Sequence, residues 1–214
     1  MDGTVSRGII EKWLKAWSLS RKLPLPEKYK SGFKIEVGEE KQKARYVFPE
    51  ITEDFIQLSK EINDSWVYLK VAASADEVKE SISRKWQIQP PGYMMYCTGE
   101  MISNEKKIPE EYNMTLEKYN ASSTLKIFAE NGTLACSGHL VLVDDLAIYD
   151  RIATEEEHRR KGLASFLMHE LEKIVLLNGI SNSFLVATAQ GKTLYESLGW
   201  KLYSPYTSVV IPGT

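Results

Sequence analysis

Apolar positions in the first half of the chain switch between helical spacing and strand spacing. From Gly8 to Leu23 they recur on one helical face, and Pro24 and Pro26 follow, so the pattern predicts an amphipathic helix that ends there. The other predicted elements are strands at 33–37, 44–48, 66–72 and 93–97 and helices at 52–62 and 76–86. Strands that alternate with helices predict an α/β layer in which the helices cover a sheet.

The second half opens with a hairpin signal. Apolar runs flank Asn131 and Gly132, a pair that tolerates the positive φ angles of a type I′ turn, so we predict a two-residue hairpin. The further predicted elements are a strand-like stretch at 140–154, a helix at 162–177, a strand at 184–188, a helix at 192–198 and a strand at 206–211.

A polar stretch separates the two halves. Residues 103–112 hold charged side chains and Pro109, which are poor core material. The chain is therefore predicted to consist of an N-terminal α/β half at 1–100, a linker at 101–113 and a C-terminal module at 114–214.

Composition excludes several classes of protein. Apolar residues make up 43% of the chain and charged residues 26%, and no apolar run approaches the roughly 18 residues of a membrane span, so we expect no membrane partner. The formal net charge of -2, with both signs mixed along the chain, disfavours nucleic acid. Cys97 and Cys136 are too few for a disulfide framework, and the N-terminus lacks a signal-peptide pattern, so we expect a cytoplasmic protein. The three histidines are dispersed, and we predict no metal.

The segment that carries chemistry is the turn from Glu155 to Ala164, where a predicted strand runs into a helix N-terminus. Such an end presents unpaired backbone N–H groups and about half a positive charge, which favour a phosphate group. Gly162 lets the backbone approach closely, and Arg159, Arg160 and Lys161 add positive charge. An ordinary solvated turn is the alternative. We interpret the turn as a diphosphate site, and His158 as a structural or exposed residue.

Two motifs in register resemble those of the GCN5-related N-acetyltransferases (GNAT). Arg159-x-x-Gly162-x-Ala164 resembles the family's R/Q-x-x-G-x-G/A pyrophosphate loop, and the segment 194–200, Leu-Tyr-Glu-Ser-Leu-Gly-Trp, resembles its L-Y-E-x-x-G-F segment. The resemblance covers residues 146–214 and implies that acetyl-CoA is the cosubstrate.

The resemblance also implies roles for individual residues. The cofactor-binding residues would be Ile152, Ala153 and Thr154 through their backbone, Arg159, Arg160, Lys161, Gly162, Leu163 and Ala164 around the diphosphate, and Thr188 beside the pantetheine arm. At the last position family members often carry Asn, which leaves that side-chain contact open. Tyr195 occupies the family's general-acid position.

Acetyl transfer to an amine also needs a base. At pH 7 only about one in 2,500 molecules of an amine with a pKa near 10.4 is neutral. Asp145, Tyr149 and Asp150 lie on or near the predicted acceptor strand, and Asp150 is our first choice, with water and a simple salt-bridged strand end as alternatives.

A segment of the first half weakly resembles a segment of the second half. Residues 69–74, followed by Glu80, Ser81 and Trp86, resemble residues 184–189, followed by Glu196, Ser197 and Trp200. The N-terminal half is either a degenerate copy of the module or an unrelated α/β extension. Its turn at 48–54 is acidic and free of glycine, so we expect it to bind no cofactor.

We therefore predict an α/β protein with a mixed, splayed central sheet and flanking helices, of the acyl-CoA N-acyltransferase type, in which the first half is the candidate for a degenerate tandem copy. Its function would be transfer of an acetyl group from acetyl-CoA to an amine on a small molecule or a protein. The alternative is a catalytically inactive acetyl-CoA-binding regulatory or scaffold protein. A homodimer is compatible with both.

Overall fold

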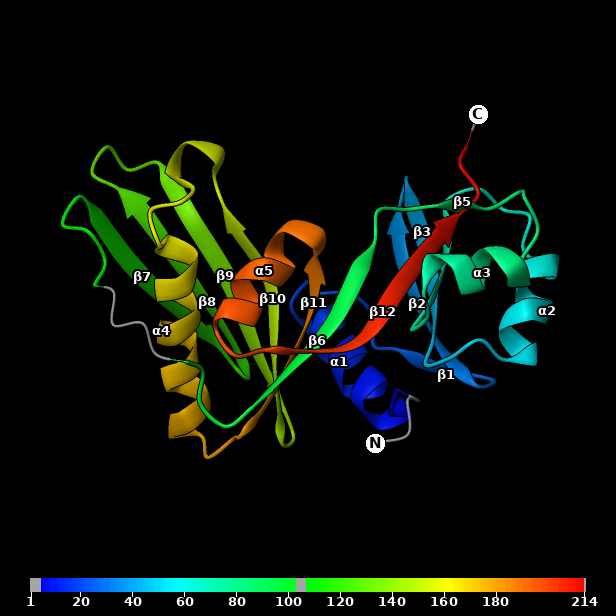
Figure 1. Cartoon of the computed structure of the whole chain (residues 1–214), viewed down its shortest axis with the longest axis horizontal. Coiled ribbons are helices and arrows are strands. Elements are labelled where there is room, and N and C mark those ends of the chain that lie inside the picture. Colours follow the sequence, from blue (N-terminus) through cyan, green and yellow to red (C-terminus); the bar gives the residue numbers. More distant parts are fainter. Residues whose placement is uncertain (1–4, 103–106, 214) are drawn as a thin grey trace. The chain divides into compact units, whose positions relative to one another are not determined.

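The computed structural model describes residues 5–102 and 107–213 (Figure 1). The chain forms two compact units and passes between them after Met95, Leu185, Lys192 and Lys201. Unit 1 comprises the chain up to Met95, Val186–Lys192 and the segment from Leu202 onward, and unit 2 comprises Tyr96–Leu185 and Thr193–Lys201.

Each unit thus contains segments from both predicted halves. The predicted division of roles between 1–100 and 114–214 stays a prediction. Of the predicted linker at 101–113, residues 103–106 lie outside the described residues.

Unit 1 is built on a mixed sheet with the strand order β1-β2-β3-β4-β12. Its elements are α1 (Arg7–Leu19), β1 (Glu27–Tyr29), β2 (Gly32–Glu39), β3 (Gln42–Phe48), α2 (Glu53–Glu61), β4 (Val67–Val71), α3 (Ala75–Ser81), β5 (Gln87–Ile88) and β12 (Lys201–Val210). Strands β2 and β3 are antiparallel, and α2 crosses over to β4, which is parallel to β3. Strand β12 pairs antiparallel with β4 and with the short β5.

The helices of unit 1 form where the apolar spacing predicts them. In α1 the predicted face is buried, including Trp13, whose ring meets Tyr206 edge-on at 5.5 Å. Thr52 caps α2 by accepting a hydrogen bond from the Phe55 backbone N–H. The predicted helix at 76–86 is shorter in the structure, because Ile82 is extended and ends α3. Trp86 instead packs in the core and donates from Nε1 to the carbonyl of Ser59 at 3.0 Å.

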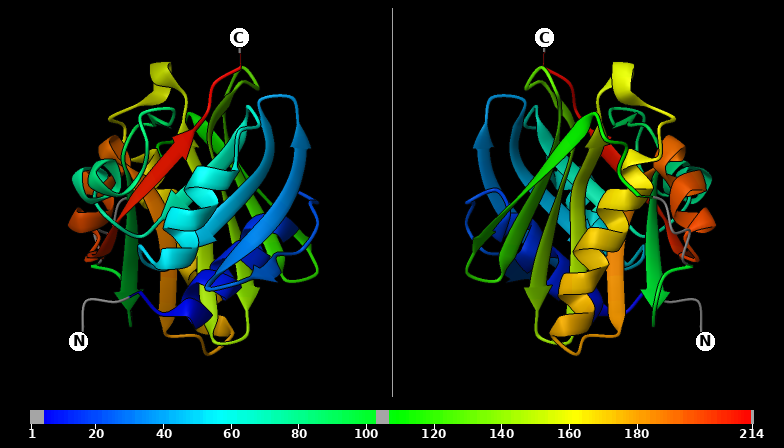
Figure 2. Two further views of the ribbon diagram at one scale, coloured as in Figure 1. Left: turned by 90° about the vertical axis from the view of Figure 1, so that its right-hand side faces the viewer. Right: turned by 90° about the vertical axis from the view of Figure 1, so that its left-hand side faces the viewer.

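Unit 2 is built on a second mixed sheet, with the strand order β11-β10-β9-β8-β7. Its elements are β7 (Tyr112–Tyr119), β8 (Ser122–Ala129), β9 (Leu134–Val143), β10 (Leu146–Thr154), the 3-10 turn η1 (Glu156–His158), α4 (Leu163–Leu177) and the start of β11 (Asn182–Thr188). Strands β7 to β10 are antiparallel neighbours, and α4 crosses over to β11, which is parallel to β10. Helix α4 lies along β8, β9 and β10 on one face of this sheet (Figure 2). Strands β6 (Gly92–Thr98), β11 and β12 and helix α5 (Ala189–Ser197) contain residues of both units.

Two local predictions in this unit are corrected by the structure. The predicted strand at 140–154 is a hairpin of β9 and β10, and it turns at Asp144, which has a φ of 53°. The hairpin at Asn131-Gly132 is confirmed, but its type I′ turn is wrong, since of this pair only Gly132 has a positive φ. The Gly132 N–H donates to the Ala129 carbonyl, and the ladder shifts after Ile127. The predicted two-residue loop is therefore wrong, and the connection is a three-residue loop with a bulge, which is the next most common type in hairpins.

The mixed α/β sheet with flanking helices predicted from the sequence is confirmed. The same order of antiparallel hairpin, helix, parallel strand and helix occurs twice, as β2-β3-α2-β4-α3 and as β9-β10-α4-β11-α5. This order supports the degenerate-copy interpretation of the first half. Within residues 5–102 and 107–213, no helix is both long and apolar enough to cross a bilayer.

Close packing at the start of β2 generates a stability prediction. A Cβ on Gly32 would lie 2.6 Å from the Val47 carbonyl oxygen and 2.9 Å from Phe48 Cδ1. Because the carbonyl belongs to a paired strand, we expect Gly32→Ala to lower the free energy of unfolding by about 1–3 kcal/mol. Urea unfolding followed by tryptophan fluorescence measures this, since four of the five tryptophans belong to unit 1.

The matched control is Gly8→Ala in the first turn of α1. A Cβ there meets only Ser6 Oγ at 3.7 Å, so this variant should be as stable as the wild type or up to about 1 kcal/mol more stable. Equal unfolding midpoints for Gly32→Ala and the wild type would contradict the packing argument.

Candidate functional site

Strand β10 changes its neighbours partway along its length. Its first residues, Leu146–Ile148, pair with β11, and the ladder on that side ends at Ile148. On the other side β10 stays paired with β9 as far as Thr154. Within the described residues, β10 therefore has a strand neighbour on one side only from Tyr149 onward.

A bulge interrupts the ladder with β9 just after this separation. Asp150 pairs with His139 and Ala153 pairs with Ser137, so β10 contains one extra residue here. Arg151 lies within the shift at a φ of 50°, in the left-handed region that few side chains adopt. Bulges bend a strand and redirect its side chains. The residues after Asp150 consequently leave the fully buried environment of Leu146–Tyr149 and alternate in exposure.

The predicted pantetheine-binding residues follow this bulge. Ala153 is exposed, and Ile152 and Thr154 are half-buried. A strand with one unpaired edge offers the backbone donors and acceptors that an amide-containing arm needs. The strand geometry therefore suits the expected role of these three residues, and their contact with a ligand stays a prediction.

The turn between β10 and α4 has two residues in the left-handed region, Arg160 at a φ of 63° and Gly162 at 81°. Gly162 is the N-cap of α4, and in the described structure no side chain caps this end. Arg159 folds back, and its Nε donates to the carbonyl of Thr154 at 3.2 Å. The orphan N–H groups of the first turn of α4 thus follow directly on a basic turn and can receive an anion.

Helix α2, the counterpart of α4 in the repeated order, begins differently. The Thr52 hydroxyl already accepts a hydrogen bond from its first turn, and that turn contains Glu53 and Asp54. A capped and acidic helix end disfavours a second anion. Of the two crossover helices, only α4 has an N-terminus suited to a diphosphate.

Gly138 on β9 allows α4 to approach the sheet closely. A Cβ at this position would lie 2.5 Å from Ile152 Cδ1 and 2.6 Å from Leu167 Cδ2. Leu163 is buried and Ala164 is half-buried at the start of the helix. The small residue on β9 thus holds the helix N-terminus close to the strand that follows the bulge.

Tyr195 on α5 is buried, with 6% of its surface exposed. Burial raises the pKa of its phenol, and the nearby Cys136 and Asp150 raise it further. Its ring packs near Trp200 at 6.0 Å. The structure therefore places two predicted catalytic residues, Tyr195 and Asp150, in one electrostatic environment within unit 2, and the raised pKa keeps the phenol protonated as a hydrogen-bond donor.

Asp150 interacts with groups on both sides of the bulge. Its carboxylate lies 3.6 Å from Arg151 Nε, and its side chain is 15% exposed. Arg151 Nη2 in turn lies 3.2 Å from His139 Nδ1, which is 3.0 Å from Thr124 Oγ1. No local pattern indicates this His139 network, because its members come from three strands.

The other two candidate bases are poorly placed. Asp145 belongs to the β9–β10 turn, at the opposite end of β10 from the basic turn and about 30 Å along the strand at ~3.3 Å per residue. Tyr149 is buried, and its ring meets Trp200 edge-on at 5.3 Å. Burial, and to a lesser extent Glu172, raises the pKa of Tyr149, so its phenolate is disfavoured.

Thr188 belongs to unit 1 and caps α5. Its Oγ1 accepts a hydrogen bond from the Gly191 N–H at 3.1 Å, and the residue is exposed. The threonine therefore has a local structural role besides the ligand contact that the resemblance implies for its position.

Tyr112 lies outside the predicted site, and His158, predicted to be structural or exposed, is half-buried against it. The Tyr112 hydroxyl lies 2.9 Å from His158 Nδ1 and accepts a hydrogen bond from Lys161 Nζ at 2.9 Å. Strand β7 begins at Tyr112, whereas the sequence placed this residue in the linker. The alternation of Tyr112, Met114 and Leu116 was the signal that could have indicated the strand.

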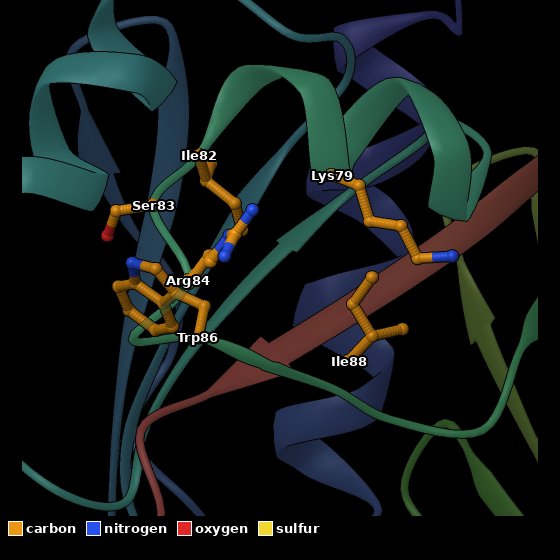
Figure 3. A pocket seen from close by; sticks show the side chains of 6 residues that line it. All are labelled: Lys79, Ile82, Ser83, Arg84, Trp86 and Ile88. Carbon is orange, nitrogen blue, oxygen red and sulfur yellow. The ribbon is translucent and has the colours of Figure 1, made fainter.

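Unit 1 contains a hollow of about 460 Å³ after α3. Figure 3 shows its apolar lining of Ile82, Trp86 and Ile88, together with the cationic ends of Lys79 and Arg84. Lys79 is paired with Asp76 at 3.2 Å. Among the described residues that line it there is no carboxylate, imidazole, phenol or thiol, so the hollow lacks a group that could exchange a proton at neutral pH.

Comparison with known proteins agrees with this geometry. Residues 123–202 match the model of the acetyltransferase (GNAT) domain. Residues 123–202 are a GNAT domain. The match covers β8 to α5, and it includes the bulge, the basic turn and Tyr195. No curated protein matches the chain.

Solved structures show that the GNAT fold extends over the chain. A GCN5-related N-acetyltransferase from Kribbella flavida has a TM-score of 0.67 at 11% identity, covering 99% of this chain and 97% of that chain. One from Sphaerobacter thermophilus has a TM-score of 0.60 at 10% identity, covering 86% and 78%. A tandem GNAT protein from the clavulanic acid biosynthesis pathway has a TM-score of 0.53 at 9% identity, covering 80% and 76%.

The uncapped start of α4 in the GNAT domain generates a binding prediction. Gly162→Glu places a carboxylate at the expected diphosphate site, and Gly162→Gln places an amide of the same shape there with the same backbone strain. We expect the Glu variant to bind acetyl-CoA at least about tenfold more weakly than the Gln variant, because only the Glu side chain repels an anion. Calorimetric titration measures both affinities. Equal affinities in two folded variants would show that the diphosphate does not lie at this helix end.

Proposed function

We propose that the protein is an acetyl-CoA-dependent N-acetyltransferase. The observation that carries the proposal is the uncapped N-terminus of α4, which follows a basic turn at the end of the bulged strand β10. In this proposal the turn 159–162 and the first turn of α4 bind the diphosphate, and the free edge of Ile152, Ala153 and Thr154 binds the pantetheine arm.

The buried phenol of Tyr195 suits the departing thiolate. The amine attacks the thioester carbonyl, the C–S bond breaks, and the electron pair stays on sulfur. The thiol of the leaving group has an ordinary pKa near 8.5. A phenol is already protonated at neutral pH, and the raised pKa of Tyr195 extends this to higher pH, so the residue can donate a hydrogen bond to the sulfur as the charge develops.

Asp150 is the proposed proton acceptor for the attacking amine. It lies where β10 leaves β11, and its charge acts on Tyr195. An acceptor that arrives between these two groups would give up a proton to one side and receive the acetyl group from the other. A carboxylate here also favours a cationic acceptor, which matches an amine on a small molecule or a protein.

The alternative function, an acetyl-CoA-binding protein without turnover, is favoured by one observation. Arg151 Nε lies 3.6 Å from the Asp150 carboxylate, so a cation already occupies part of the space around the group that would receive the proton of the amine. Incubation of the protein with acetyl-CoA and a panel of amines distinguishes the two functions, because only the transferase releases the free thiol of CoA. Acetyl-CoA binding without thiol release from any amine would favour the non-catalytic function.

The contrast between α4 and α2 predicts one acetyl-CoA per chain. The end of α2 is capped by Thr52 and carries Glu53 and Asp54, so it should not bind a second diphosphate. Equilibrium dialysis should return a stoichiometry of one for the wild type and no saturable site in Gly162→Glu. A stoichiometry of two would contradict a cofactor-free first half.

The position of Tyr195 predicts a selective loss of turnover in Tyr195→Phe. The change keeps the packing of the ring and removes only the donor. We expect kcat to fall by about 10²- to 10⁴-fold, whereas acetyl-CoA affinity should change by less than about tenfold. The loss should shrink with an acyl donor whose leaving thiol is more acidic.

Because the pKa of Tyr195 is raised, wild-type kcat should not decline through the ordinary tyrosine range near pH 10 on account of this residue. Steady-state kinetics with a confirmed amine acceptor measures each of these effects. Full kcat in Tyr195→Phe would make the tyrosine a packing residue.

A further inference from the structure

Tyr112 at the start of β7 contacts the basic turn that is 46 to 49 residues away in sequence. The residue is buried, with 5% of its surface exposed. Its ring meets the His158 imidazole edge-on, with centroids 5.6 Å apart and an interplanar angle of 82°. His158 and Lys161, its two partners, bracket Arg159 and Arg160.

Chemistry fixes the direction of one of the two hydrogen bonds of Tyr112. An ammonium group can only donate, so the phenol oxygen accepts from Lys161. The phenol hydrogen is donated to His158 Nδ1 in the tautomer whose proton is on Nε2. Such a chain polarises along its length, so each bond strengthens the other.

A neutral partner holds Lys161 without neutralising it. The hydrogen bond with Tyr112, and to a lesser extent the charge of Glu111, raises the pKa of Lys161, which stays charged. Lys161 forms no ion pair with any other residue in the described ranges. A carboxylate in place of the phenol would cancel the charge beside the start of α4, whereas tyrosine fixes its position and preserves it.

The turn needs such support because its backbone is strained. Arg160 is in the left-handed region at a φ of 63°, a conformation that persists only where the surroundings enforce it. Arg159 is held on one side by its bond to the Thr154 carbonyl. The Tyr112 bonds hold the residues on both sides of Arg159 and Arg160.

We propose that Tyr112 is a positioning residue for the diphosphate of the acyl donor. Through Lys161 and His158 its hydroxyl keeps the turn 159–162 in the binding conformation before the ligand arrives. Preorganisation of this kind raises affinity because less ordering remains to be done on binding. The identity of the ligand rests on the proposed function, whereas the ordering of the turn does not.

The first experiment tests the ordering alone. Trypsin cleaves after Arg159, Arg160 and Lys161 only when the turn opens, so the initial rate of cleavage there reports the open population. We expect Tyr112→Phe to be cleaved about 5 to 30 times faster than the wild type. The control is Tyr119→Phe, the same change at the far end of β7, where the side chain is 76% exposed. Equal cleavage rates for Tyr112→Phe and Tyr119→Phe would overturn the proposal.

The second experiment separates positioning from a general structural effect. Coenzyme A carries the diphosphate and pantetheine does not. We expect Tyr112→Phe to raise the Kd for coenzyme A by about 5- to 30-fold and to leave the Kd for pantetheine within about twofold of the wild type. With a confirmed acceptor, KM for acetyl-CoA should rise at unchanged kcat.

A double-mutant cycle tests the route through Lys161. In a Lys161→Met background, Tyr112→Phe should weaken coenzyme A binding by a smaller factor than in the wild type. Equal weakening of both ligands, or unchanged affinity for coenzyme A, would overturn the positioning role. If wild-type protein did not bind coenzyme A, the proposed function and the ligand of this proposal would both fail, and the trypsin experiment would still report on the turn.

Discussion

The separation of β10 from β11 after Ile148 is the constraint on which the candidate site depends. Parallel strands beneath a crossover helix normally stay paired, and here the pairing ends at Ile148 and a bulge at Arg151 follows. The left-handed conformation of Arg151 costs about 1–3 kcal/mol, and the contact of its side chain with His139 helps to offset that cost. The same event frees a strand edge and brings Asp150 to the point of separation.

The helix that follows depends on this bend and on close packing. Because Gly138 lacks a side chain, α4 approaches β9 and the strand segment after the bulge. The positive end of the helix dipole, the Arg159–Lys161 charges and the free strand edge therefore belong to one continuous stretch of unit 2. The site for an anion and the strand edge that can hydrogen-bond to amides are therefore adjacent, which suits a ligand that has both an anionic group and amides.

The two halves show that a shared order of helices and strands does not by itself determine whether a helix N-terminus can bind an anion. Helices α2 and α4 occupy equivalent places between a hairpin and a parallel strand, yet one begins with a capped acidic turn and the other with an uncapped basic one. The difference lies in a few turn residues, which can change without altering the core. Burial also matters, because the phenol of Tyr195 acquires its raised pKa from its surroundings in the fold.

Local sequence determined the helices, most strands, the Asn131-Gly132 hairpin and the basic turn, because apolar period, caps and turn residues act over short distances. It could not give the bulge at Arg151, the break between β9 and β10, or the strand that begins at Tyr112. Those features depend on which strands pair, and pairing is decided by packing between distant segments. For the same reason the motif indicated Tyr195 and the basic turn. Only the tertiary structure showed that Tyr149 is buried, that Asp145 lies in an exposed turn, and that Tyr112 contacts Lys161. A contact between residues 49 positions apart leaves no local pattern, since only the folded sheet brings them together.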